Sequence, residues 1–196
     1  MPQPKRDRPD TPLRSDAQRN RERILKVAIE ELTRCADAPL SGIAKKAGVG
    51  QGTFYRNFPH REALVLEVYR YEMQQVADAA PELLATREPE RALREWMDRL
   101  ARFAMTKAGL ADAIRLVTSA PGGPEKPRPT PVMDAAQLLL RANEEAGTIR
   151  PGVSADDFFL VIGGLWLIDP GEDWQPRATR FLDFVMDALR AGAPGR

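Results

Sequence analysis

The sequence contains few of the residues that metal, disulfide and catalytic sites need. Its 196 residues include one cysteine, Cys35, and one histidine, His60. A disulfide framework and an ordinary His/Cys zinc site each require several such residues, so both are excluded. The single histidine lies beside the motif described below, and neither a phosphate-binding loop nor a Rossmann glycine pattern occurs. We therefore expect no metal, no cofactor and no catalytic residue, and hence a protein that is not an enzyme.

Long apolar runs are missing as well. No stretch of 18 apolar residues occurs, and the N-terminus is charged and rich in proline. The sequence therefore predicts neither a membrane span nor a signal peptide, and we expect a cytoplasmic protein with no membrane partner. Cys35 is interpreted as a small core residue or a bystander thiol, with redox sensing as the alternative. His60 is expected to be solvated in a turn.

Charge is unevenly divided along the chain. The net charge is +1, but residues 1–61 hold 13 Lys/Arg against 7 Asp/Glu, a net +6, which leaves −5 for residues 62–196. Positive charge concentrated in one segment favours binding to a polyanion, because each neutralised phosphate releases counterions. The alternative for any single lysine is that it only solvates the surface. With 43% hydrophobic residues, the chain can bury the core of one or two compact domains.

Residues 40–58, LSGIAKKAGVGQGTFYRNF, place two short amphipathic segments around a Gly-Val-Gly break. Ile43 and Ala47 are one helical turn apart in the first segment, and Phe54 and Phe58 are one turn apart in the second. Small Ala44 would let the two helices approach closely. The other face of the second segment carries short or planar hydrogen-bonding side chains that a major groove admits. This pattern predicts a helix-turn-helix that binds duplex DNA.

The stretch from Ile24 to Tyr69 resembles the DNA-binding half of the TetR family of transcriptional repressors, with IAKKAGV followed by GQGTFYRNFPHREAL and a long fourth helix. Beyond residue 71 the resemblance is one of layout. One departure is Pro39 ahead of the second helix, where the family has a Thr or Ser cap, and the connection over residues 33–38 is short for the family. The resemblance implies a three-helix DNA-binding domain followed by a helical domain that binds an effector and dimerises.

The resemblance also assigns DNA contacts within the motif. Gln51 and Thr53 are candidates for base edges and the adjacent backbone, and Gly52 would let the helix come close to DNA. Arg56 would contact either a guanine or a phosphate, whereas Phe54 and Phe58 are expected in the core. The predicted set is completed by Lys45 and Lys46, which flank the groove, by Tyr55 and Asn57 at phosphate-binding positions, and by Arg61, beside helix-start amides that can face phosphate.

Apolar spacing predicts an all-α protein of about nine helices, because no alternating strand pattern occurs. We expect a flexible basic arm over residues 1–16, a helix-turn-helix DNA-binding domain over residues 17–60, and a helical ligand-binding and dimerisation domain over residues 61–196.

Caps and prolines set the predicted helix ends. The first helix is expected over residues 17–35, capped by Ser15 or Asp16, and the fourth from Arg61 to about residue 80, where Pro81 ends it. Five prolines within residues 121–131 predict a loop, either disordered or a lid over a pocket.

The last two predicted helices carry more apolar residues than one helix face needs. Residues 161–168, VIGGLWLI, are apolar nearly all round, and more than one apolar stripe runs along residues 174–189. Either the monomer or a second copy would bury them. Gly163 and Gly164 would permit close helix packing, and the TetR layout implies a four-helix dimer interface, which suits a two-fold operator. The predicted interface residues are Val161, Leu165, Phe181, Val185 and Leu189.

Large apolar side chains on separate C-terminal helices are either plain core or the lining of a cavity. The TetR layout would bring eight of them together, namely Tyr69, Met73, Trp96, Leu100, Phe103, Ile114, Met133 and Trp166. A cavity of this kind would take a small, largely apolar effector. Arg99, Arg102 or Arg115 are candidates to orient an anionic ligand.

The motif and the resemblance together predict a homodimeric regulator, expected to be a repressor, that binds a pseudo-palindromic operator in double-stranded DNA and is released by a small-molecule effector. The alternative is a constitutive or architectural DNA-binding dimer with no effector pocket. A cavity in the helical domain would separate the two hypotheses.

Overall fold

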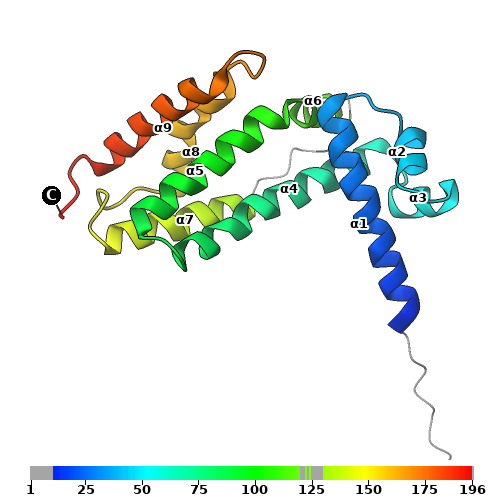
Figure 1. The fold of residues 1–196 in the computed structure, drawn as a ribbon, viewed down its shortest axis with the longest axis horizontal. Coiled ribbons are helices and arrows are strands. Elements are labelled where there is room, and N and C mark those ends of the chain that lie inside the picture. The colour runs from blue at the N-terminus through cyan, green and yellow to red at the C-terminus, as the bar shows by residue number, and fades with distance from the viewer. Residues whose placement is uncertain (1–10, 120–121, 123, 125–129, 196) are drawn as a thin grey trace, which may run out of the picture.

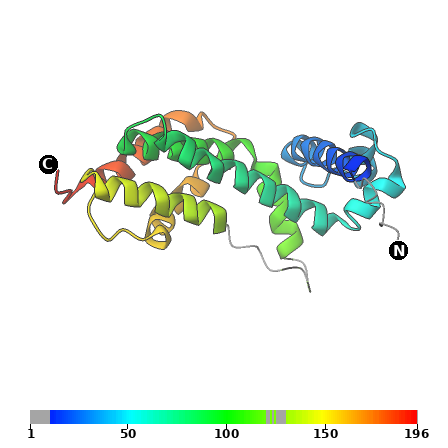
Figure 2. The ribbon, with the colours of Figure 1, turned by 90° about the horizontal axis from the view of Figure 1, so that it is seen from below.

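The computed structural model describes residues 11–119, 122, 124 and 130–195. Over these residues the chain forms nine α-helices and one 3₁₀ helix, with no strand. The molecule is elongated, with the first three helices at one end and the C-terminus at the other (Figures 1 and 2). The prediction of an all-α fold is confirmed for this part of the chain.

The N-terminal end consists of α1 (Thr11–Arg34), α2 (Leu40–Lys46) and α3 (Gln51–Asn57). Because α1 begins at Thr11, the prediction of an arm that continues to residue 16 and of a cap at Ser15 or Asp16 is wrong. Pro12 falls in the first turn of α1, where a proline is tolerated because the first backbone N–H groups have no partner within a helix. Residues 1–10 of the predicted arm lie outside the described residues.

The longest helix of the second part is α4 (Arg61–Leu84), which passes through Pro81. The prediction that Pro81 ends this helix is therefore wrong. Proline removes one backbone hydrogen bond, but Ala80 and Leu83 are buried, and their packing carries α4 through its last turn.

The remaining elements are α5 (Pro89–Thr106), α6 (Ala108–Thr118), α7 (Thr130–Glu145), α8 (Ala155–Ile162), η1 (Gly163–Leu167) and α9 (Trp174–Arg190). The chain does not continue α8 to Ile168 but tightens into the 3₁₀ helix η1. The loop predicted over residues 121–131 falls mostly outside the described residues, which here include only Gly122, Pro124 and the start of α7.

Helix α4 connects the two ends of the molecule. It contacts α1 on the DNA-binding side and α5, α6 and α7 in the helical domain, while α6 also packs directly on α1. Trp96 of α5 lies in the centre with none of its side chain exposed, and its indole N–H donates a hydrogen bond of 2.9 Å to the carbonyl of Val76. The buried indole is therefore satisfied, as a close-packed core requires.

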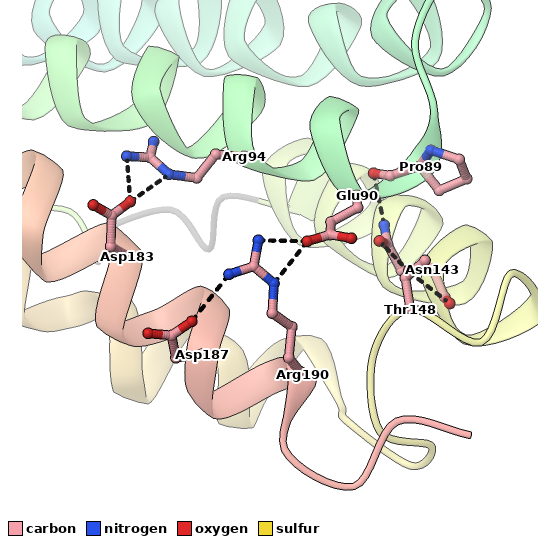
Figure 3. Close-up of polar contacts among 8 residues, drawn as sticks. All are labelled: Pro89, Glu90, Arg94, Asn143, Thr148, Asp183, Asp187 and Arg190. Carbon is pink, nitrogen blue, oxygen red and sulfur yellow. Dashed lines mark hydrogen bonds and ion pairs between the residues drawn. The ribbon is translucent and has the colours of Figure 1, made fainter. Parts of the chain in front are cut away.

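Polar contacts hold α9 and α7 against α5 (Figure 3). The Arg94 guanidinium on α5 lies 3.0 Å from the Asp183 carboxylate on α9, and Arg190 on α9 binds Glu90 on α5. Asn143 of α7 is buried, and its amide donates a hydrogen bond of 2.9 Å to the carbonyl of Pro89. These contacts hold one side of α9 against α5, and the opposite side of α9 stays exposed.

No helix in the described ranges is both long and apolar enough to cross a membrane.

Candidate DNA interface and effector pocket

The break between α2 and α3 is a tight turn that depends on glycine. Gly48 adopts φ = 64°, a left-handed conformation that side chains disfavour. Its N–H donates to the carbonyl of Lys45, and the N–H of Val49 donates to that of Ala44, so the end of α2 is closed by two hydrogen bonds. The prediction that two short helices meet at this break is confirmed.

The inner faces of α2 and α3 are buried as predicted. Ile43, Ala44, Phe54 and Phe58 are between 0% and 1% exposed. The rings of Phe54 and Phe58 pack 6.1 Å apart, and Tyr55 rests edge-on against Phe54. The recognition helix is thus fixed to the domain by one side, which directs its polar side outward.

That outer side carries the predicted DNA-contacting groups. Gln51, Gly52 and Arg56 are exposed, and Thr53 and Asn57 are partly so. The Arg56 guanidinium folds back along α3, where it donates to the Gly52 carbonyl at 3.1 Å and to the Thr53 hydroxyl at 3.2 Å. A Cβ atom added to Gly52 would meet nothing within 4 Å, so the protein itself does not require a glycine there. This absence of an internal reason is consistent with a partner that approaches the backbone closely.

Of the predicted DNA-contacting cations outside α3, the two lysines of α2 differ in whether they pair with an acidic side chain. Lys45 is exposed, whereas the Lys46 ammonium forms an ion pair of 2.7 Å with Glu31 of α1. Hydrogen bonding to Lys46 lowers the pKa of the Glu31 carboxyl. Both lysines lie at the surface. An ion pair there contributes little free energy, so Lys46 can leave Glu31 for a DNA phosphate.

Arg61 has an internal role besides the one predicted. Its guanidinium donates to the carbonyls of Ala38, at 2.8 Å, and of Ala36, and so ties the start of α4 to the loop between α1 and α2. Its contact with phosphate stays a prediction. The sequence offers no signal for this contact, since the loop and Arg61 are more than 20 residues apart.

Two isolated residues also need correction. His60 is exposed, but it is more than a solvated turn residue, because its Nδ1 accepts a hydrogen bond of 3.3 Å from the N–H of Ala63 and caps α4. Cys35 is exposed, so its interpretation as a core residue is wrong.

Arg21 of α1 supports the recognition helix from behind, and the sequence analysis missed it. Its guanidinium lies 4.9 Å from the centre of the Phe58 ring and forms an ion pair of 2.8 Å with Glu67 of α4. One side chain therefore joins α1, α4 and the end of α3. Arginines are common throughout the N-terminal third, so no local pattern distinguishes this one.

The helical domain contains an apolar cavity of about 360 Å³. Six of the eight predicted residues line it: Tyr69, Met73, Leu100, Phe103, Ile114 and Trp166. The prediction is wrong for Trp96, which is buried behind Phe159 with their rings in edge contact, and for Met133, which packs on the core without reaching the cavity. The lining residues that the sequence analysis missed are Ala111, Val132, Phe159 and Gly163, each close in sequence to a predicted helix position.

None of the three arginines suggested for an anionic ligand lines this cavity. Arg99 and Arg102 border a separate surface groove between α5 and α9, where Glu95 and Asp98 also lie. Arg115 is exposed and pairs with Asp112 at 2.8 Å. That prediction is wrong because these side chains project outward from α5 and α6, away from the cavity.

An exposed apolar face lies on α8, η1 and α9. Leu160, Val161, Leu167 and Phe184 are between 55% and 85% exposed, and we call these four the apolar face. Among the predicted interface residues, Val161 belongs to it and Phe181 is partly buried where its ring packs closely on Gly164.

The other three predicted interface residues are buried in the protomer. Leu165, Val185 and Leu189 are at most 7% exposed and belong to its core, so the prediction that they face a partner is wrong. Helical spacing identified residues that are buried, but the protomer itself supplies the burial.

Two family profiles match this sequence, one in each half. The profile of bacterial regulatory proteins of the TetR family matches residues 24–68, and the C-terminal domain profile of SbtR-like transcriptional regulators matches residues 88–191. No curated protein sequence matches the chain.

Solved structures extend the similarity over nearly the whole length. A TetR transcriptional regulator from Streptomyces coelicolor is 40% identical, with 87% of this chain and 98% of that chain covered and a TM-score of 0.72. A TetR regulator from Mycobacterium vanbaalenii is 33% identical, with 91% and 99% covered and a TM-score of 0.66. The Thermus thermophilus repressor FadR, solved with lauroyl-CoA, is 24% identical over 86% and 94% with a TM-score of 0.51, which shows a shared fold alone.

Proposed function

Given that the chain belongs to the TetR family of bacterial regulatory proteins, we propose that it is a dimeric repressor, which binds a pseudo-palindromic operator and releases it when a small effector binds the helical domain. Proteins of this family are DNA-binding regulators of transcription and not enzymes, and this chain is one of them.

The outer face of α3 supports operator binding and carries the proposal. Gln51, Thr53 and Arg56 stand on a helix whose other side is fully buried, so they reach a major groove without any rearrangement of the core. Lys45 and Lys46 flank the same helix, where phosphates of the duplex would lie.

The apolar face supports a dimer. Leu160, Val161, Leu167 and Phe184 are large apolar side chains on neighbouring elements, and a monomer rarely exposes such a group to water. A two-fold pairing of α8 and α9 buries them against their own copies. It also presents two recognition helices to the two half-sites of a palindrome.

The cavity supports effector control, because its walls belong to elements that reach both other functional parts. Tyr69 lies on α4, which follows the recognition helix, and Ile114 lies on α6, which packs on α1. Gly163 and Trp166 lie on η1, beside the apolar face. A ligand changes the spacing of the recognition helices only if it binds one arrangement more tightly than the other.

Operator binding is tested with duplexes selected by the purified protein and titrated at two salt concentrations. Thr53→Ala should weaken binding to the selected duplex by about 1–3 kcal/mol. Thr106→Ala is the matched control, because the exposed Thr106 hydroxyl donates only to the Arg102 carbonyl of its own helix. An affinity that depends on neither salt nor sequence would refute the proposal.

The second candidate is a constitutive or architectural DNA-binding dimer. It differs from the first in that no ligand of the cavity would control DNA binding. Compounds that raise the melting temperature of the protein are tested for release of the selected duplex. If no stabilising compound lowers DNA affinity, effector control fails and the constitutive alternative replaces it.

A further inference from the structure

The chemistry of the cavity narrows the class of its ligand. Among the described residues that line it, none is charged, and four are aromatic: Tyr69, Phe103, Phe159 and Trp166. Flat ring faces on several walls favour a planar molecule.

Hydrogen-bonding groups are few in this cavity and lack internal partners. Tyr69 is only 8% exposed, yet no hydrogen bond joins its hydroxyl to another described residue. Burial raises the pKa of Tyr69, which keeps the hydroxyl protonated and able to donate. Unlike the Thr33 hydroxyl, which is fully buried without a partner, the Tyr69 hydroxyl stays accessible at the cavity, so an acceptor atom of a ligand can replace water there.

An anionic ligand fits this environment poorly. A carboxylate or phosphate leaving water requires a cation or several donors to replace its hydration, and the three arginines suggested for that role, Arg99, Arg102 and Arg115, do not line the cavity.

We propose that the cavity selects an uncharged, planar, apolar molecule with a hydrogen-bond acceptor, to which the Tyr69 hydroxyl donates. This inference rests on the proposed effector control and specifies its ligand class. Tyr69 is then the residue that distinguishes ligands with an acceptor from pure hydrocarbons, and the lack of a cation among the described lining residues disfavours anionic ones.

Three probes of one framework test this inference by isothermal titration calorimetry on the full-length protein. They are 2-acetylnaphthalene, 2-ethylnaphthalene and 2-naphthoate, which share two fused rings and differ only in a ketone, an ethyl group or an ionised carboxylate. The ketone should bind tightest, about 2- to 10-fold more tightly than the ethyl compound, as a neutral hydrogen bond allows. The carboxylate should bind at least about 100-fold more weakly than the ketone.

Two variants identify the site and the donor. Tyr69→Phe should reduce ketone affinity to that of the ethyl compound and leave the ethyl compound unchanged, whereas Tyr71→Phe, on the exposed side of α4, should change neither. Gly163→Val should weaken both neutral probes, because a side chain there enters the cavity.

Each result decides the question. If 2-naphthoate binds as tightly as the ketone, the inference of an uncharged ligand is overturned while the effector pocket stands. If Tyr69→Phe leaves ketone binding unchanged, the donor role is overturned. If none of the three probes binds, the ligand class is overturned, while effector control stands or falls by the compound screen described above. If Gly163→Val has no effect on probe binding, the probes bind outside the cavity and this inference fails.

Discussion

Gly109, at the start of α6, lies where the helical domain closely approaches the DNA-binding domain. A Cβ atom added to Gly109 would lie 2.5 Å from the carbonyl oxygens of both Leu32 and Thr33 in the last turn of α1. Ordinary contacts between carbon and oxygen are about 3.3–3.6 Å, so Gly109→Ala requires the two helices to separate by about 1 Å. The obstacle is backbone, which cannot rotate away as a side chain would.

The expected magnitude is a balance of two effects. Forcing an extra carbon into a close-packed contact costs about 1–3 kcal/mol. Alanine has a higher helix propensity than glycine, which offsets up to about 1 kcal/mol. We therefore expect Gly109→Ala to lower the free energy of unfolding by about 1–2 kcal/mol. For a chain of this length, the melting temperature falls by about 2–8 °C.

Gly163→Ala is the matched control. Gly163 has helical dihedral angles, φ = −53° and ψ = −23°, and its added Cβ would meet nothing within 4 Å. The same chemical change should therefore raise stability by about 0.4–1 kcal/mol. Urea unfolding of both variants at one protein concentration is the assay, because the stability of a dimer depends on concentration. A Gly109→Ala protein as stable as the wild type would show that α6 does not pack tightly on α1 and would refute this reasoning.

Further variants test the other parts of the molecule. Phe184→Asp should give a folded monomer in light scattering, whereas Val185→Asp should unfold the protein, since only the first side chain is exposed; a dimeric Phe184→Asp protein would contradict the proposed interface. Arg61→Lys should lower the free energy of unfolding by about 1–3 kcal/mol, because one ammonium cannot replace a guanidinium that spans two carbonyls. Arg61→Gln removes the charge, and the salt dependence of its operator binding should stay unchanged, whereas a slope reduced by about 1 would indicate a phosphate contact. Gly52→Ala should leave stability unchanged or slightly raised but weaken operator binding, and unaltered DNA affinity would show that the helix backbone does not approach the duplex.

Local patterns predicted the helix-turn-helix well because its determinants lie close together in sequence. Phe54 and Phe58 are one turn apart, and the left-handed turn needs a glycine at Gly48, so a short segment contains the information that defines it. The same holds for much of the cavity, where Leu100 and Phe103 face inward from one stripe of α5.

Contacts between distant segments were not predictable in this way. Arg61 resembles a DNA-binding cation by position, but its partners are two carbonyls of a loop whose placement depends on how α1 and α4 pack. Arg21 likewise acquires its role only where α1 crosses Phe58 and Glu67. A guanidinium can donate to carbonyls, carboxylates, rings or phosphates, and only the folded chain determines which of them is near.

The choice of Val185 and Leu189 as interface residues was wrong for a more instructive reason, which α9 illustrates. Leu182, Val185 and Leu189 recur at three- and four-residue intervals and face α5, alongside Asp183, whose carboxylate binds Arg94 at the edge of that contact (Figure 3). Regular spacing of this kind reports a buried stripe but not which molecule covers it. Phe184 is out of phase with the stripe and projects to the other side, 73% exposed, although a helix that packed on one neighbour alone would place a polar residue there. Phe184, outside the core stripe, is therefore a better candidate for the proposed subunit interface than the stripe itself, because the protomer does not bury it.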